Sequence, residues 1–146
     1  MGVSVTAEIA INRSPSVVAA YAGDPLNAPR WYRRITTAEW ITEPPLGVGS
    51  QFEFRAKFLG KHLVYTYEFV EFTPETSLTM RTAEGPFPME TTYTWAADRN
   101  GGTTRMTISN RGQPVGFSRL MAPLMTTAMR RAMSQDLRQL KTLLEA

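Results

Sequence analysis

Residues 117–144 read FSRLMAPLMTTAMRRAMSQDLRQLKTLL, and this stretch decides the fold because it predicts one long helix at the end of the chain. Four methionines, Met121, Met125, Met129 and Met133, stand four residues apart and therefore share one helical face. Methionine is unbranched, polarizable and able to change rotamer easily, so this face is suited to cover an apolar surface. That surface is either an ordinary core or a cavity whose contents vary, and the spacing fits both.

One acidic residue interrupts the apolar face of the predicted helix. Asp136 falls between Met133 and Leu140, while Arg130 and Arg138 fall on the opposite side. A buried carboxylate must be paired with a donor, or be protonated with a raised pKa. Asp136 is therefore a candidate acid, base or polar anchor in a cavity. The alternative is a structural role, as partner of a strand arginine or of a backbone N–H group.

Strand patterns dominate the chain ahead of this helix. Residues 50–59 alternate strictly, with Phe52, Phe54, Ala56 and Phe58 on one side and polar residues on the other. Such clean alternation is typical of an antiparallel sheet with one face in water. Similar patterns predict strands at 3–11, 36–42, 50–59, 62–72, 77–82, 87–97 and 103–111.

Two short helices are expected after the first strand, because Ser14-Pro15 and Asp24-Pro25 each place proline behind an N-cap residue. The order of elements predicts an α+β fold in which a curved antiparallel sheet of about seven strands wraps around the C-terminal helix. The length of 146 residues predicts a single domain over 1–146. A strongly curled sheet around one helix does not close completely, so we expect a cavity between them.

Aromatic and methionine side chains are predicted to line this cavity. In the fourth strand we place Tyr65, Tyr67 and Phe69 inward, although a bulge would turn their even-numbered neighbours inward instead. Tyrosine in an apolar pocket supplies a polar handle that can orient a hydroxyl or carbonyl of a ligand, although aromatics are also common in sheets for structural reasons. The predicted ligand-binding residues are Trp31, Phe54, Tyr65, Tyr67, Met80, Met89, Tyr93, Met121, Met125 and Met129. Trp31 and its neighbour Tyr32 are placed at the mouth.

Catalysis would need further polar groups inside the cavity. The candidates are Asp136, Tyr93 and Arg111, the last because it stands at the end of the final strand beside the expected rim. An enclosed Asp136, Glu68 or Glu90 near a tyrosine or an arginine would favour an enzyme over a carrier. The usual place of a strand arginine is the wet outer face.

Composition removes several classes of chemistry. The chain has no cysteine and one histidine, His62, which removes disulfides, thiolate metal sites and cysteine nucleophiles and leaves little basis for a zinc site. We therefore expect no metal and no cofactor. No apolar run approaches the ~20 residues that span a bilayer, and the N-terminus lacks a basic signal-peptide segment. We expect a cytoplasmic protein without a membrane span.

The charge balance argues against a nucleic-acid partner, because the formal net charge is only +3. Arg30, Arg33 and Arg34 flank Trp31 and Tyr32, a combination that can stack on bases and contact phosphates. No second patch in the sequence extends this cluster. Acidic headgroups of a ligand, or plain solvation, explain it better.

Several short motifs, in this order and spacing, resemble the START, Bet v 1 and polyketide cyclase/dehydrase-like proteins of the SRPBCC superfamily, across almost the full length. The motifs are Ser14-Pro15 with Val18, the segment 24–31, Gly47-Val48-Gly49, the segment 70–74, the segment 102–105 and the segment 136–141. The resemblance implies a helix-grip fold with a cavity for a small molecule. It does not imply one reaction, since the superfamily includes lipid carriers, hormone receptors and aromatase/cyclases.

Three functions remain open. The first is binding of a small hydrophobic or aromatic molecule, lipid or polyketide-like, in the cavity. The second is a polyketide cyclase, aromatase or dehydratase, which would fold its substrate in the cavity and supply one or two acid/base groups. The third is an accessory module that acts through a protein partner. The expected partner is thus a small hydrophobic ligand, and a homodimer stays open.

Overall fold

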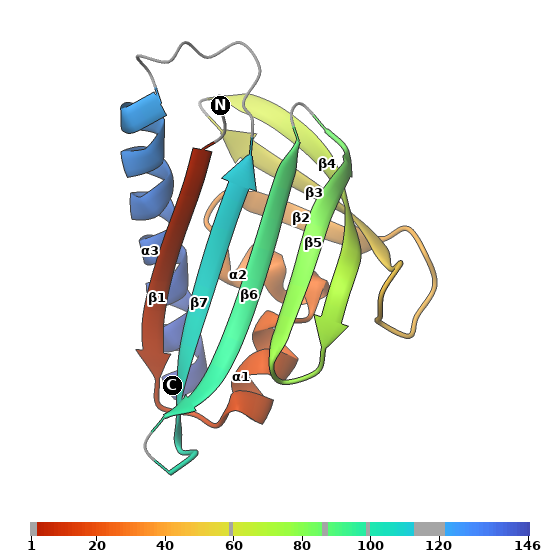
Figure 1. Ribbon diagram of the computed structural model, residues 1–146. Helices are drawn as coiled ribbons and strands as arrows, with labels where there is room; N and C mark the ends of the chain where they lie inside the picture. Colours follow the sequence, from red (N-terminus) through yellow and green to blue (C-terminus); the bar gives the residue numbers. More distant parts are fainter. Residues whose placement is uncertain (1–2, 59, 86–87, 99, 113–121) are drawn as a thin grey trace.

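The computed structural model describes residues 3–58, 60–85, 88–98, 100–112 and 122–146. Seven antiparallel strands form one sheet in the order β1-β7-β6-β5-β4-β3-β2, and the long helix α3 lies along β1 (Figure 1). The strands are β1 (Val3–Ile11), β2 (Ile35–Trp40), β3 (Gln51–Phe58), β4 (Lys61–Thr73), β5 (Ser77–Glu84), β6 (Met89–Asp98) and β7 (Thr103–Gly112). This curved sheet with its C-terminal helix confirms the predicted α+β, helix-grip architecture.

The short helices follow the two proline signals. Ser14 caps α1 (Pro15–Ala22) by accepting the N–H of Val17, and Asp24 accepts the N–H of Leu26 at 3.0 Å. The second signal opens a 3₁₀ turn, η1 (Pro25–Asn27), which continues directly into the α-helix α2 (Ala28–Trp31). The helical segment therefore ends at Trp31.

Alternation decides which side chains of the sheet face inward. Phe52 and Phe54 of β3 stand opposite Tyr67 and Tyr65 of β4, and Phe69 is 1% exposed. The predicted inward set of β4 is therefore correct up to Phe69. A bulge follows it, because the register with β5 shifts between Phe69 and Glu71. This bulge, at Val70, follows the tyrosines and leaves them inward. The other register shift, between Thr66 and Tyr67, passes over Ala83 of β5 and not a residue of β4.

The helix α3 (Ala122–Glu145) buries a narrower face than the sequence pattern predicts. Its core contacts are Met133, Leu137 and Leu140, each at most 4% exposed, whereas Leu124 is 65% exposed and Leu143 38% exposed. Leu124 and Leu143 precede Met125 and Leu144, which pack against the core. One residue is about 100° of helical rotation, so Leu124 and Leu143 point away from the buried face. The predicted helical residues 117–121 lie outside the described residues. In the part of the chain that the structure describes, no helix is long and apolar enough to cross a membrane.

Candidate functional site

Burial on the inner face changes along the length of the sheet. At the end beside α1 the inner side chains are completely packed, and we call this the closed half; it contains Ile11, Val18, Leu78, Trp95, Met106 and Leu140, all 0–4% exposed. Toward the other end the inner side chains are only partly covered, and we call this the open half. It contains Ala56, Leu63, Tyr65, Tyr67, Thr82, Met89, Asn110, Met125 and Met129.

The exposure of inward side chains increases from the closed half to the open half along both β6 and α3. On β6 the exposed fraction is 4% at Trp95 and 3% at Tyr93, and Met89 is half-buried. On α3 it is 1% at Leu137 and 4% at Met133, after which Met129 and Met125 are half-buried. The predicted methionine face is thus divided: Met133 belongs to the core, and Met125 and Met129 face the open half.

Polar side chains gather where the two halves meet. Tyr32, directly after α2, shares a hydrogen bond between hydroxyls with Tyr93 of β6. The indole ring of Trp31 lies 4.2 Å from the Tyr32 ring and 5.8 Å from the Tyr93 ring, between centroids. The two tyrosine hydroxyls therefore sit in an aromatic frame. Only one of the two hydroxyl protons is needed for the bond between them, so the other remains available to an acceptor.

A second chain of polar groups extends from this pair into the open half. The Tyr67 hydroxyl lies near Thr91, and the Thr91 hydroxyl donates to Oδ1 of Asn110 at 2.6 Å. Thr91 is 5% exposed. Alternate positions of neighbouring strands place these side chains together, because Thr91 stands opposite Asn110 in the register of β6 and β7.

Burial keeps the three tyrosines neutral. Desolvation raises the pKa of Tyr32, Tyr67 and Tyr93 above the usual tyrosine value, and a neighbouring tyrosine raises the pKa of each further. The hydrogen bond with Tyr93 raises the pKa of Tyr32 as well, whereas the partner hydroxyl lowers that of Tyr93 and Thr91 lowers that of Tyr67. At neutral pH these groups are hydrogen-bond donors and not phenolate bases.

Asp136 of α3 is the carboxyl group of this cluster. It is 8% exposed, and its Oδ1 accepts the backbone N–H of Arg33 at 3.1 Å. Desolvation raises the pKa of Asp136 to about 6, against the stabilising influence of that N–H group and of the Arg34 and Arg33 charges. Its charge also acts on Tyr32 and Tyr93. A carboxyl group that titrates near neutral pH beside neutral hydroxyls is suited to exchange a proton with a bound molecule.

The structure brings most of the predicted residues to one face. Phe54, Met80 and Tyr93 are buried on it, and the open half contains Tyr65, Tyr67, Met89, Met125 and Met129. Trp31 was expected at the mouth, but it is 1% exposed because α2 carries it into the core. Met121 lies outside the described residues.

Arg111 does not join this cluster. It neighbours the inward Asn110, so alternation turns it to the outer face, where it pairs with Glu90 and its side chain is 68% exposed. Glu90 also pairs with Arg81, and Gln51 donates to Glu68 at 2.8 Å. Of the three carboxylates whose enclosure would favour an enzyme, Asp136 is the enclosed one.

Two members of the cluster, Thr91 and Asn110, are absent from the predicted site. They lie two residues from the inward Tyr93 and Ile108, so extending the alternation would have found them. Tyr32 was expected at the mouth beside Trp31, but its contact with Tyr93 was not predicted, because its position depends on how η1 and α2 turn the chain back over the sheet. The described residues contain no group of three or more metal-ligating side chains, and His62 is exposed on β4.

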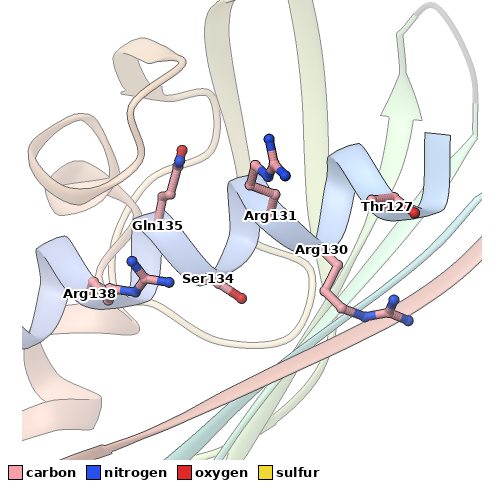
Figure 2. Close-up of a pocket in the computed structure, with 6 residues that line it drawn as sticks. All are labelled: Thr127, Arg130, Arg131, Ser134, Gln135 and Arg138. Atoms are coloured by element: carbon pink, nitrogen blue, oxygen red, sulfur yellow. The ribbon is translucent and has the colours of Figure 1, made fainter. Parts of the chain in front are cut away.

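Two hollows lie on the outer surface of α3, away from this face. One is shallow, about 520 Å³, and its lining comes entirely from the helix: Thr127, Arg130, Arg131, Ser134, Gln135 and Arg138 (Figure 2). The other is a cleft of about 660 Å³ between residues 29–33 and residues 135–142. Neither hollow contains a methionine of the predicted site.

Comparisons with known proteins agree with this architecture. The family model described as polyketide cyclase/dehydrase and lipid transport matches residues 2–145. A search of the curated proteins finds none that matches.

Solved structures share the fold at low sequence identity. The TTHA0849 protein of Thermus thermophilus is 21% identical, with a TM-score of 0.82, over 97% of this chain and 96% of that one. The Zhui aromatase/cyclase of Streptomyces sp. R1128 is 14% identical, with a TM-score of 0.82, over 99% and 94%. A START superfamily protein of Mycobacterium smegmatis is 12% identical, with a TM-score of 0.83, over 97% of each chain. The family match over residues 2–145 shows that the chain belongs to the polyketide cyclase/dehydrase and lipid transport family, and the shared helix-grip fold agrees with this.

Proposed function

We propose that this protein binds a small apolar or aromatic molecule, lipid or polyketide-like, against the open half of the inner face. The observation that carries the proposal is the hydroxyl pair of half-buried Tyr32 and buried Tyr93, set among aromatic rings beside partly covered side chains. Apolar walls with a few placed polar groups are the usual composition of a small-molecule site. The hydroxyl proton that the pair retains would be donated to a carbonyl or hydroxyl oxygen of the ligand.

The methionines of α3 support a ligand of variable shape. Met125 and Met129 are half-buried in the open half and can repack around different apolar surfaces. Phe54, Tyr65 and Tyr67 offer ring faces and edges to a planar molecule, with centroids of Phe54 and Tyr67 5.6 Å apart. A carbonyl-bearing aromatic compound would use both features, whereas a simple alkane would leave the tyrosine donor unpaired.

The experiment that tests binding combines mass spectrometry of small molecules that co-purify with the native protein and fluorescence titration with 1,8-dihydroxyanthraquinone. Met125→Trp would fill the open half and abolish binding, at a stability cost of about 1–3 kcal/mol. Val64→Trp is the matched control, because Val64 is 43% exposed on the outer side of β4. Equal binding by both variants would contradict the proposal.

A second function is favoured by one observation, the enclosure of Asp136 beside Tyr32 and Tyr93. In cyclisation of a polyketide-like substrate, the Asp136 carboxylate would remove a proton from a carbon between two carbonyl groups. The tyrosine hydroxyls would donate hydrogen bonds to the resulting enolate oxygen. The enolate carbon would then attack a second carbonyl, forming a carbon–carbon bond, and the new alkoxide would take the proton back from Asp136.

Binding and catalysis are separated by Asp136→Asn. The amide keeps the size of the side chain and an oxygen to accept the Arg33 N–H, but it cannot take up a proton. A carrier would keep its affinity for 1,8-dihydroxyanthraquinone in this variant. An enzyme would keep that affinity and lose roughly 10²–10⁴-fold in the rate of cyclisation of a tetraketide or longer poly-β-keto thioester, measured by product analysis.

A further inference from the structure

Arginines on the sheet and arginines on the helices have different surroundings. On the sheet, Arg55, Arg81, Arg105 and Arg111 each pair with a glutamate at 3.1 Å or less. Along α2 and the residues after it, and along α3, the described residues provide no carboxylate within ion-pair distance of Arg30, Arg33, Arg130, Arg131 or Arg138. A group of uncompensated positive charges is therefore concentrated on the outer surface of these two helices.

Part of this surface is concave. The cleft of about 660 Å³ has one wall from α2 and the residues after it and another from α3. Its lining consists of Pro29, Arg30, Trp31, Tyr32, Arg33, Gln135, Arg138, Gln139 and Thr142, which includes three arginines and no acidic residue. Arg33 Nη1 donates to Oε1 of Gln135 at 2.9 Å, which joins the two walls. Asp136, next to Gln135, is turned inward and is 8% exposed.

The neighbouring shallow hollow continues the same chemistry along α3. It shares Gln135 and Arg138 with the cleft and adds Arg130, Arg131 and two hydroxyl residues (Figure 2). Arg130 points away from Arg131 in this view, so these two side chains do not converge on one point. The cleft, which has two walls, is the better candidate for a defined site.

We propose that the cleft between α2 and α3 binds the phosphate group of an organic phosphate, through Arg30, Arg33 and Arg138. A phosphate monoester carries about −1.5 to −2 charges at neutral pH and offers three acceptor oxygens. A carboxylate has two acceptor oxygens, which one guanidinium group can satisfy with two hydrogen bonds. Three guanidinium groups together with amide and hydroxyl donors provide more hydrogen bonds than a carboxylate can accept, and a phosphate has the additional oxygens to accept them. The cleft opens on the outside of the molecule, and its base reaches Trp31 and Tyr32, which also belong to the proposed apolar site on the inner face.

The test measures binding of glycerol 3-phosphate by isothermal titration calorimetry, at constant ionic strength set with sodium chloride because screening weakens exposed charges. A second arm measures sedimentation of the protein with vesicles that contain phosphatidic acid, against vesicles of phosphatidylcholine alone. The variant is Arg30→Gln with Arg138→Gln. The matched control is Arg55→Gln with Arg105→Gln, which removes the same charge from the sheet. Circular dichroism verifies that both variants fold.

We expect saturable binding of glycerol 3-phosphate. The affinity should fall at least about tenfold in the cleft variant and less than about twofold in the control. This result would establish a site for a free organic phosphate. Binding to phosphatidic acid vesicles with the same pattern of loss, without binding of glycerol 3-phosphate, would establish the lipid headgroup as the source. The proposal is overturned if neither probe binds, or if the two double variants lose binding equally.

Discussion

The closed and open halves of the inner face are formed by the same strands and helix. They differ in how completely their inward side chains are buried. In the closed half, Trp95, Met106 and Leu140 bring large side chains from β6, β7 and α3 together and are 0–4% exposed. In the open half the same three elements contribute Met89, Asn110 and Met129, which are half-buried. Curvature explains the difference, because a bent sheet stays close to a straight helix along only part of its length.

Under the proposed function, the two ends of the fold divide stability and binding between them. The closed half is packed at native density, so removing a methylene group there lowers the free energy of unfolding. The open half has partly covered apolar surface, which is where the ligand is proposed to lie. The polar cluster of Tyr32, Tyr93 and Asp136 lies between the packed core and this proposed binding surface.

The largest expected effect is the difference in the free energy of unfolding between the variants Leu140→Ala and Met129→Ala. Leu140 is fully buried in the closed half, so its truncation leaves a cavity and should lower the free energy of unfolding by about 3–4 kcal/mol. Met129 is half-buried, and its truncation should cost about 1 kcal/mol or less. Urea denaturation of both variants measures the difference. Equal costs would mean that the open half is packed as firmly as the closed half.

The second effect is a pH dependence at the boundary. The folded pKa of Asp136, about 6, lies above its ordinary value of 3.8, so folding favours the protonated form. This stabilisation is present below about pH 4 and is lost as the pH rises through 6. Relative to Asp136→Asn, which does not titrate, the free energy of unfolding of the native protein should fall by roughly 2–3 kcal/mol between pH 4 and pH 7.

Urea denaturation of both proteins across this range provides the measurement. The difference between them isolates Asp136 from Glu90 and Glu145, whose pKa values are lowered and which respond to acid in the opposite direction. A difference that stays constant with pH would show that the Asp136 carboxyl is well solvated. That outcome would also remove the reason for assigning it a proton-transfer role.

Much of this arrangement could be predicted from the sequence because its periodicities are local. The strict alternation around Phe52 and Phe54 determined the inner face of β3, and the proline signals at Ser14-Pro15 and Asp24-Pro25 located both short helices. The position of Asp136 on the inner side of α3 also followed from helical spacing. It accepts a backbone N–H, as the structural alternative expected, whereas its acid/base role beside the two tyrosines stays a prediction.

The remaining features depend on three-dimensional curvature, which local patterns do not specify. Leu124 has the same apolar character as Met125, yet it is 65% exposed because only a narrow stripe of α3 meets the sheet. The hydroxyl contact between Tyr32 and Tyr93 joins residues 61 positions apart, and the path of η1 and α2 determines it. Arg111 was placed at the rim by its position along the strand, whereas strand alternation decides its face.

A smaller effect is expected for Tyr93→Phe, which removes one hydroxyl from the boundary. The Tyr32 hydroxyl loses its hydrogen-bond partner in a buried setting, which should cost about 1–2 kcal/mol in the free energy of unfolding. The affinity for 1,8-dihydroxyanthraquinone should fall as well, because the tyrosine pair is the proposed donor. Tyr21→Phe on α1 is the control and should leave the affinity unchanged. An unchanged affinity in Tyr93→Phe would mean that the ligand is held by apolar contacts alone.

The smallest effect is expected for Arg111→Gln, which tests whether the distinction between the two halves is confined to the inner face. Arg111 lies level with the open half, since its neighbour Asn110 belongs to it, but its own side chain is on the outer face and 68% exposed. Glu90 keeps Arg81 as a partner at 2.9 Å when Arg111 is replaced. Exposed ion pairs contribute little to stability, so the free energy of unfolding should change by about 0.5 kcal/mol or less. The affinity for 1,8-dihydroxyanthraquinone should stay within about twofold of the native value. A large loss of affinity would place Arg111 at the mouth of the binding surface and would require the open half to extend around the edge of the sheet.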